Sequence, residues 1–183
     1  MRVFSIALIL LLSLSAASRA DVESGPAVGA KAPALKVLAM TGDHEGKEID
    51  YAADREDKPT IYIFVKGEHF ERPTARFLKV LDAAAPKVAR KCEIVAVWLT
   101  DDADAAKAYL PRVQKSMQFD ATPLCVFSGK KSGPEDWGVN LDADVTAVVV
   151  TDKTVRASFG YRSVNDTSVP EVEAALKKAV EAK

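Results

Sequence analysis

The sequence lacks the short motifs that identify several classes of functional site. It contains no glycine-rich phosphate loop, no G-x-S-x-G nucleophile motif and no H-E-x-x-H zinc motif. It also lacks an excess of basic residues, because 25 lysines and arginines stand against 26 aspartates and glutamates. Nucleic acids and anionic membrane surfaces bind basic faces, so neither is the expected partner. No internal repeat or low-complexity segment is present.

Long hydrophobic runs are also absent, apart from a short one at the N-terminus. Residues 1–20, MRVFSIALILLLSLSAASRA, combine an early Arg2 with an apolar run from Val3 to about Leu14. Small residues, Ser18 and Ala20, stand at the end of this segment. This run is shorter than the roughly 20 apolar residues of a membrane-spanning helix, which favours a signal peptide cleaved after Ala20 over an uncleaved anchor. We therefore expect an exported protein, periplasmic or extracellular, with no stable membrane span after cleavage.

The chain that would remain after cleavage suits one domain. It has 183 − 20 = 163 residues, and its charge is −3 because 25 − 2 = 23 basic residues face 26 acidic ones. This length is enough to bury a core without disulfides or metals. Residues 21–32 are small, polar and punctuated by glycine and proline, so we expect a flexible lead-in there and a single domain over residues 33–183.

Cysteine is scarce, since Cys92 and Cys125 are the only two in the chain. Disulfides persist in exported proteins, so a bond between the two is one alternative. Their surroundings favour another, because Cys125 lies within the apolar run PLCVF and Cys92 opens the run CEIVAVWL. Cysteine in such runs usually behaves as a small buried hydrophobe. Burial raises a thiol pKa, so we expect Cys125 in particular to be inert.

Hydrophobic periodicity predicts alternating strands and helices. The run TIYIFV (60–65) has no polar alternation, which is typical of a strand covered on both faces. Pro73 fits the first turn of a helix with one apolar stripe, and Pro86 is expected to kink or end it. The other expected elements are a hairpin over 34–51, strands at 93–99, 121–127, 145–150 and 154–161, and helices at 103–115 and from Ser168, where Ser168 and Glu171 have capping-box spacing. This order predicts one α/β sandwich whose sheet begins parallel and ends antiparallel.

A run of acidic residues follows the second buried strand. Asp101, Asp102 and Asp104 stand at the start of the helix expected from Ala103. Carboxylates in a first turn complement the helix dipole, which explains the run without a ligand. The alternative is a metal site, but the run lacks the glycine and terminal glutamate of a calcium loop. We expect no metal and no cofactor.

The order of these elements, preceded by VGAKAPAL at Val28–Leu35, resembles the thioredoxin-like redoxins, the group that holds AhpC/TSA peroxiredoxins and TlpA-like thiol-disulfide proteins. TIYIFV is similar to their first core strand, EIVAVWLTDD to their second, and WGV to the segment before their final hairpin. The resemblance spans about residues 28–180. It implies an α/β fold, a thioredoxin-like three-layer sandwich that has a mixed sheet with helices on both faces.

The resemblance also implies a reactive cysteine between the first core strand and the next helix, where the helix N-terminus lowers a thiol pKa. In this chain that joint is KGEHFERP, residues 66–73, and it holds no sulfur. The positions that match the family's cysteine pair are His69 and Arg72, and the threonine of the peroxidase motif is missing as well. The family's cis-proline matches Val145 or, in an alternative alignment, Pro123.

Without a thiolate at this joint, peroxide reduction and dithiol exchange lack their nucleophile. We therefore predict a degenerate redox site and a non-catalytic binding or scaffold role toward an unidentified protein or peptide. The expected binding surface is a groove between residues 66–73 and the Val145 strand start, with Phe70 as an aromatic anchor. Two alternatives remain open. One is a thiol-disulfide oxidoreductase or peroxiredoxin-like antioxidant enzyme that uses Cys125 or Cys92, and the other is weak metal binding through His69.

Overall fold

The computed structural model describes residues 20–182. The predicted signal peptide lies outside the described residues, apart from Ala20. Among residues 20–182, no helix combines the length and the apolar character needed to cross a bilayer.

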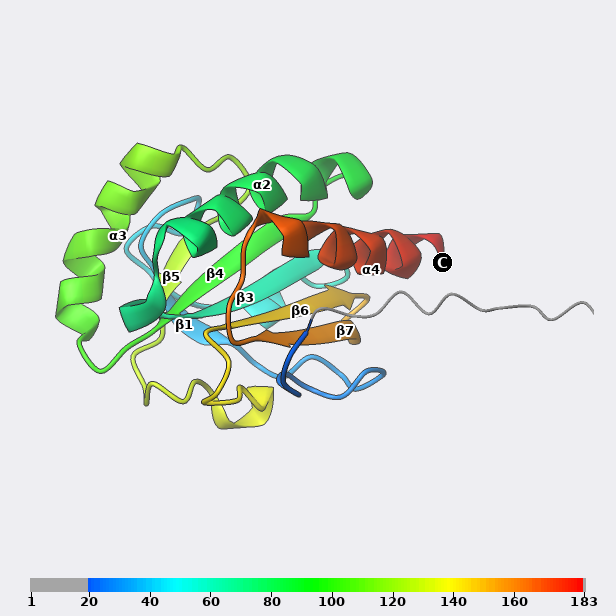
Figure 1. Ribbon diagram of the computed structural model, residues 1–183, viewed down its shortest axis with the longest axis horizontal. Helices are drawn as coiled ribbons and strands as arrows, with labels where there is room; N and C mark the ends of the chain where they lie inside the picture. The colour runs from blue at the N-terminus through cyan, green and yellow to red at the C-terminus, as the bar shows by residue number, and fades with distance from the viewer. Residues whose placement is uncertain (1–19, 183) are drawn as a thin grey trace, which may run out of the picture.

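A seven-stranded mixed sheet forms the centre of the molecule, in the order β2-β1-β5-β4-β3-β6-β7 (Figure 1). Its strands are β1 (Lys36–Ala39), β2 (Glu48–Asp50), β3 (Thr60–Lys66), β4 (Glu93–Leu99), β5 (Leu124–Val126), β6 (Val145–Thr151) and β7 (Thr154–Tyr161). Strands β3, β4 and β5 are parallel, whereas β6 runs antiparallel to β3 and β7 antiparallel to β6. The predicted change from a parallel beginning to an antiparallel end is confirmed.

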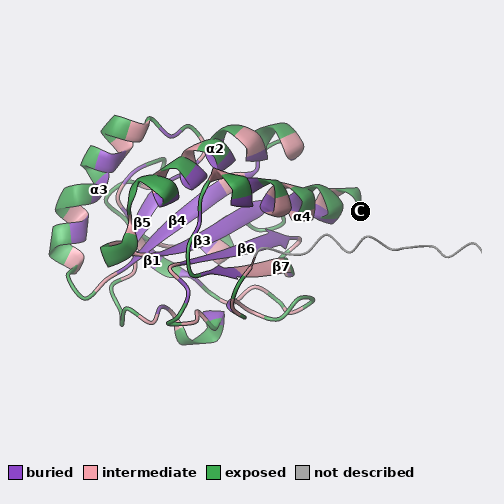
Figure 2. Cartoon of the chain, in the orientation of Figure 1, coloured by how far each residue is buried: buried purple, intermediate pink, exposed green. Residues whose placement is uncertain are grey.

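Three long helices lie on one face of this sheet, α2 (Arg72–Val88), α3 (Ala103–Met117) and α4 (Val169–Glu181) (Figure 1). Their buried sides face the sheet and their exposed sides face outward (Figure 2). The other face is covered by loops, the short helix α1 (Tyr51–Asp54) and the 3₁₀ turn η2 (Glu135–Trp137). Two further 3₁₀ turns are η1 (Gly67–His69) and η3 (Asp166–Ser168). The three-layer thioredoxin-like α/β arrangement is thus confirmed, although the helices on the second face are short.

Strand β3 is covered on both faces, as its uninterrupted apolar sequence predicts. Ile61, Ile63 and Val65 belong to the core beneath the three long helices. Tyr62 and Phe64 belong to the second core, where their ring centroids lie 4.9 and 5.0 Å from that of Trp137. Because both layers hold β3 in place, the residues at its end have a fixed position.

The segment 21–32, for which the sequence predicts a flexible lead-in, makes specific contacts with the sheet in this structure. Val22 forms an antiparallel bridge with Gly160 of β7, and the buried Ser24 hydroxyl lies 2.6 Å from the Thr146 hydroxyl. A Cβ at Gly160 would collide with the Val22 carbonyl oxygen, so glycine permits this close approach. Small residues therefore permit close packing of this segment along the sheet edge.

Three details of the helices differ from expectation. The capping box before α4 does not form, because the Ser168 side chain makes no capping bond. The Asn165 side chain instead accepts a hydrogen bond from the Thr167 N–H, one turn earlier. Helix α2 continues two residues beyond Pro86 and ends at Val88, within one turn of the proline. Helix α1 was not expected from the sequence.

Candidate functional site at the start of helix α2

Helix α2 begins near the C-terminal end of strand β3, and its N-terminus has no side-chain cap. Strand β3 ends at Lys66, the 3₁₀ turn η1 follows it, and α2 begins at Arg72. The residue before the helix, Glu71, has extended backbone angles, and its side chain makes no capping bond. Unsatisfied N–H groups give a helix N-terminus partial positive charge. This end of α2 therefore favours negative charge.

The side of this site that faces β6 is occupied by a polar cluster. His69 Nδ1 lies 2.8 Å from Asp144 Oδ1, and the Lys66 ammonium lies 3.8 Å from the same oxygen. Asp144 is held by its backbone, because its N–H donates to the Tyr161 carbonyl at 2.7 Å and its carbonyl accepts from the Lys66 N–H at 3.0 Å. The Lys66 ammonium also donates to the Leu141 carbonyl. His69 is therefore oriented by an acid that stands immediately before β6.

The structure separates the two candidates for the family's proline position. Val145 pairs directly with Val65 in the antiparallel register of β6 and β3, so it lies beside the site. Pro123 precedes β5, and β4 stands between β5 and β3. No cis peptide bond occurs in residues 20–182. The expectation of a groove against Val145 is corrected here. The Val145 side chain is buried, and the His69–Asp144 pair lies on this side of the site.

The two cysteines lie away from the site and apart from each other. Both are free thiols, in apolar clusters on opposite faces of the sheet. Cys92 precedes β4 at the end of the strand opposite the site, which is roughly 20 Å away for a seven-residue strand. Cys125 lies within β5 and is fully buried. Burial raises the pKa of each thiol to about 12, which is the direction that the sequence predicts for Cys125.

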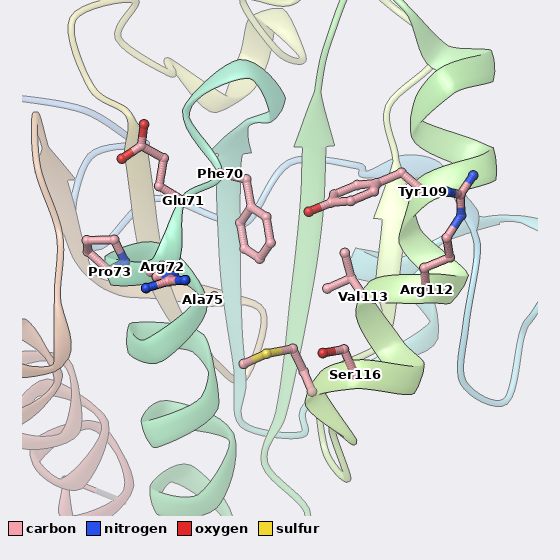
Figure 3. Close-up of a pocket in the computed structure, with 10 residues that line it drawn as sticks. Phe70, Glu71, Arg72, Pro73, Ala75, Tyr109, Arg112, Val113 and Ser116 are labelled. Atoms are coloured by element: carbon pink, nitrogen blue, oxygen red, sulfur yellow. The ribbon is translucent and has the colours of Figure 1, made fainter.

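A groove opens on the other side of the site, between α2 and α3 (Figure 3). Its volume is about 900 Å³. Phe70 and Tyr109 face each other across it, one from the segment before α2 and the other from α3 (Figure 3). The remaining lining residues are Glu71, Arg72, Pro73 and Ala75 from the start of α2 and Arg112, Val113, Ser116 and Met117 from α3. Sequence reasoning placed residues 66–73 at a binding surface but missed the half that α3 supplies.

Phe70 is half-buried and forms part of the groove wall. Its ring centroid lies 4.7 Å from that of Trp98 in β4 and 6.4 Å from that of Tyr109. The ring therefore packs on the core with one side and faces the groove with the other. The expected aromatic anchor is present, although the core holds it and it does not project freely.

The acidic residues considered as metal ligands have other partners. Asp102 caps α3 by accepting from the Ala105 N–H at 2.9 Å, as its position in the sequence predicts. Asp104 pairs with a lysine one turn later, and Asp101 lies 3.2 Å from the Lys131 ammonium. Within the described part of the chain, no group of three histidine, cysteine or acidic side chains could hold a metal ion. His69 has carboxylates nearby but no second histidine or cysteine.

Comparison with known proteins gives structural relatives only. No protein-family model matches the chain, and no curated protein matches it in sequence. Reduced Prx3 from Vibrio vulnificus superposes with a TM-score of 0.62 at 14% identity, covering 82% of this chain and 98% of that one. Peroxidoxin BcpB from Mycobacterium tuberculosis gives 0.60 at 15% identity, with 84% and 97% covered.

A protein named for thiol-disulfide chemistry is also similar. A DsbF homologue from Corynebacterium diphtheriae gives a TM-score of 0.60 at 16% identity, covering 80% of this chain and 87% of that one. These three structures match this chain over 87–98% of their own length. At such identities they establish the fold, and the chain is accordingly a thioredoxin-like α/β protein of the kind found among peroxiredoxins and thiol-disulfide proteins.

Proposed function

We propose that this protein is an exported, non-catalytic binding protein whose thioredoxin-like fold carries a degenerate redox site. One observation carries the proposal. The chain has two cysteines, and both are buried free thiols whose pKa values are raised to about 12. The attacking species in peroxide reduction and in disulfide exchange is the thiolate. At neutral pH neither cysteine supplies it, and the start of α2 has His69 and Arg72 in its place.

The chemistry that remains at the site suits binding. In the cluster of Lys66, His69 and Asp144, both basic side chains contact the Asp144 carboxylate. The groove beside it is open, lined mostly by apolar side chains and large enough for part of a partner, since ligand pockets usually occupy roughly 300–1,000 Å³. The partner is therefore a peptide or protein segment that contacts the start of α2 and the facing side of α3.

The second candidate is a thiol-dependent oxidoreductase or antioxidant enzyme that uses Cys125 or Cys92. It is favoured by the fold, which is that of proteins named as peroxiredoxins and thiol-disulfide proteins. For this candidate to hold, one of the two thiols would have to leave its apolar cluster and ionise during the reaction.

Two assays on the purified protein separate the candidates. In one, hydrogen peroxide is supplied with dithiothreitol, and in the other a small disulfide is the substrate. We expect no turnover above the buffer rate in either assay. Turnover in the wild-type protein that disappears in Cys125→Ser or Cys92→Ser would establish the enzyme and reject the binding proposal.

Export has its own test. Expression of the full chain with a C-terminal tag, followed by fractionation and N-terminal sequencing, is expected to give a periplasmic or extracellular protein that starts at Asp21. A protein in the cytoplasmic or membrane fraction that retains Met1 would reject this part of the proposal.

A further inference from the structure

The groove between α2 and α3 has the side-chain chemistry of a protein interface. Its aromatic, methionine and arginine residues are the types enriched where proteins meet, and they are represented by Phe70, Tyr109, Met117, Arg72 and Arg112. Tyr109 is 44% exposed, which is unusual for so large an apolar side chain beside an apolar wall. Aromatic and arginine side chains in such positions are the ones that contribute most to binding.

The charged side chains around the groove indicate the charge of its ligand. Two arginines and one glutamate line it, so it carries a net positive charge on a chain whose formal net charge is −1. Other basic residues of the same two helices are paired with acids: Arg76 with Asp166 at 2.8 Å, and Lys107 with Asp104 at 2.9 Å.

The two arginines of the groove have no such partner. Neither Arg72 nor Arg112 forms an ion pair with any described residue, and the Nε of Arg112 donates to the Ala108 carbonyl of its own helix at 3.2 Å. The uncapped N-terminus of α2 lies at the same rim and adds to the positive potential. Carboxylates on a partner would therefore find two unpaired guanidinium groups.

Taking these observations together, we propose that the groove binds a short peptide segment of another protein that combines bulky apolar residues with aspartate or glutamate. The apolar side chains pack between Phe70 and Tyr109, and the flanking carboxylates pair with Arg72 and Arg112. Arginine pairs with carboxylates through two parallel hydrogen bonds, which favours an acidic partner over a neutral one. This inference rests on the proposed binding function and names the partner that the site selects.

The test begins with selection of a random dodecamer peptide display library on the immobilised protein. We expect the enriched peptides to carry two or more acidic residues next to Leu, Phe, Tyr or Trp. The most enriched peptide is then synthesised, and its dissociation constant is measured by fluorescence anisotropy at 50 mM and 300 mM NaCl. Affinity should fall with salt, because exposed charge pairs are screened.

Variants locate the binding site. The double variant Arg72→Glu/Arg112→Glu and the single variant Tyr109→Ser should each weaken binding at least about tenfold. The matched control Lys87→Glu/Arg90→Glu makes the same change of charge at exposed positions at the far end of α2, and it should stay within about twofold of wild type. Circular dichroism melting checks that every variant is folded.

Several results would overturn the inference. They are enrichment of basic or uncharged peptides, enrichment no greater than on the blank surface, and binding that survives both groove variants. Sedimentation that shows a dimer broken by Tyr109→Ser would assign the groove to a second copy of this chain instead. Peptide binding is measured without oxidant or reductant, so its failure is distinct from failure of the proposed function, which the turnover assays decide.

Discussion

The interior of the sheet and the start of α2 offer opposite environments to a cysteine. Cys125, inside β5, is surrounded by apolar side chains, and its thiol pKa is raised to about 12. The start of α2 is exposed and uncapped, so a thiolate would be stabilised there, yet the chain places His69 and Arg72 at this point. The chain thus has an uncapped helix start without a cysteine, while its two thiols lie where burial favours the protonated form.

A cysteine placed at the start of α2 should show the largest effect, a large rise in thiol reactivity. In a Cys92→Ala/Cys125→Ala background, Arg72→Cys should react with iodoacetamide at pH 7 at least about 100-fold faster than Cys125 does in the native protein. The reason is that the helix N-terminus lowers a thiol pKa, whereas burial raises it. Rates are followed by mass spectrometry of the intact protein.

The control places the sulfur at the other end of the same helix. Lys87→Cys stands in the last turn of α2, where the helix dipole disfavours an anion. If Arg72→Cys reacts no faster than Lys87→Cys, the start of α2 does not stabilise a thiolate and the comparison fails.

Alkaline unfolding should show the buried environment directly. The folded-state pKa of both thiols is about 12, above the ordinary value of about 8.5, so folding favours the neutral form. Their contribution to stability is complete below about pH 8.5 and is lost as the pH rises toward 12. The loss amounts to at most about 1.4 kcal/mol per pH unit for each thiol.

Urea unfolding at intervals from pH 7 to pH 10 measures this loss. The Cys125→Ala variant should depend less on pH over that range than wild type. Buried Tyr51, Tyr62 and Tyr161, whose pKa values are also raised by burial, act in the same direction at higher pH. Cys125 also raises the pKa of Tyr51, so Cys125→Ala weakens that contribution too, whereas Tyr62 and Tyr161 have no such link to Cys125. An equal slope in the two proteins would contradict a buried, neutral Cys125.

Removing the groove wall should cost less. Phe70→Ala deletes a half-buried ring that packs on Trp98, so we expect the free energy of unfolding to fall by about 2 kcal/mol, below the range for fully buried phenylalanines. The matched variant Tyr109→Ala removes a more exposed ring and should cost less than about 1 kcal/mol. Chemical denaturation at pH 7 measures both. Equal losses would mean that Phe70 is not anchored on the core.

Breaking the polar cluster should have the smallest effect. His69 is 47% exposed, so its pairing with Asp144 belongs to the class of surface contacts worth about 0–1 kcal/mol. His69→Ala should therefore lower the free energy of unfolding by less than about 1 kcal/mol, and 0.5 M NaCl should reduce the difference further. A loss above about 2 kcal/mol would show that this side of the site carries more of the fold than the groove side.

Much of the fold was predictable because its signals are local. The run TIYIFV forms a strand buried on both faces, and Asp152 and Lys153 turn the last hairpin with positive φ angles of 52° and 56°. Such features depend on neighbouring residues and on the two-residue period of a strand. The absence of cysteine at residues 66–73 was equally visible in the sequence.

The groove and the N-terminal segment were not predictable, because both depend on contacts between distant parts of the chain. Phe70 and Tyr109 are 39 residues apart, and only the placement of α2 and α3 on the same face of the sheet brings their rings together. Val22 and Gly160 meet at a sheet edge although they are far apart in the sequence. Local composition carries no signal for this long-range pairing.

Thiol labelling of the wild-type protein at pH 8 tests the central claim most directly. The protein is treated with an excess of 5,5′-dithiobis(2-nitrobenzoate), first folded and then in 6 M guanidinium chloride. We predict no reaction of the folded protein within minutes and two thiols per chain after unfolding. One thiol that reacts rapidly in the folded protein would contradict the account, because an accessible thiolate would restore the nucleophile that the start of α2 lacks.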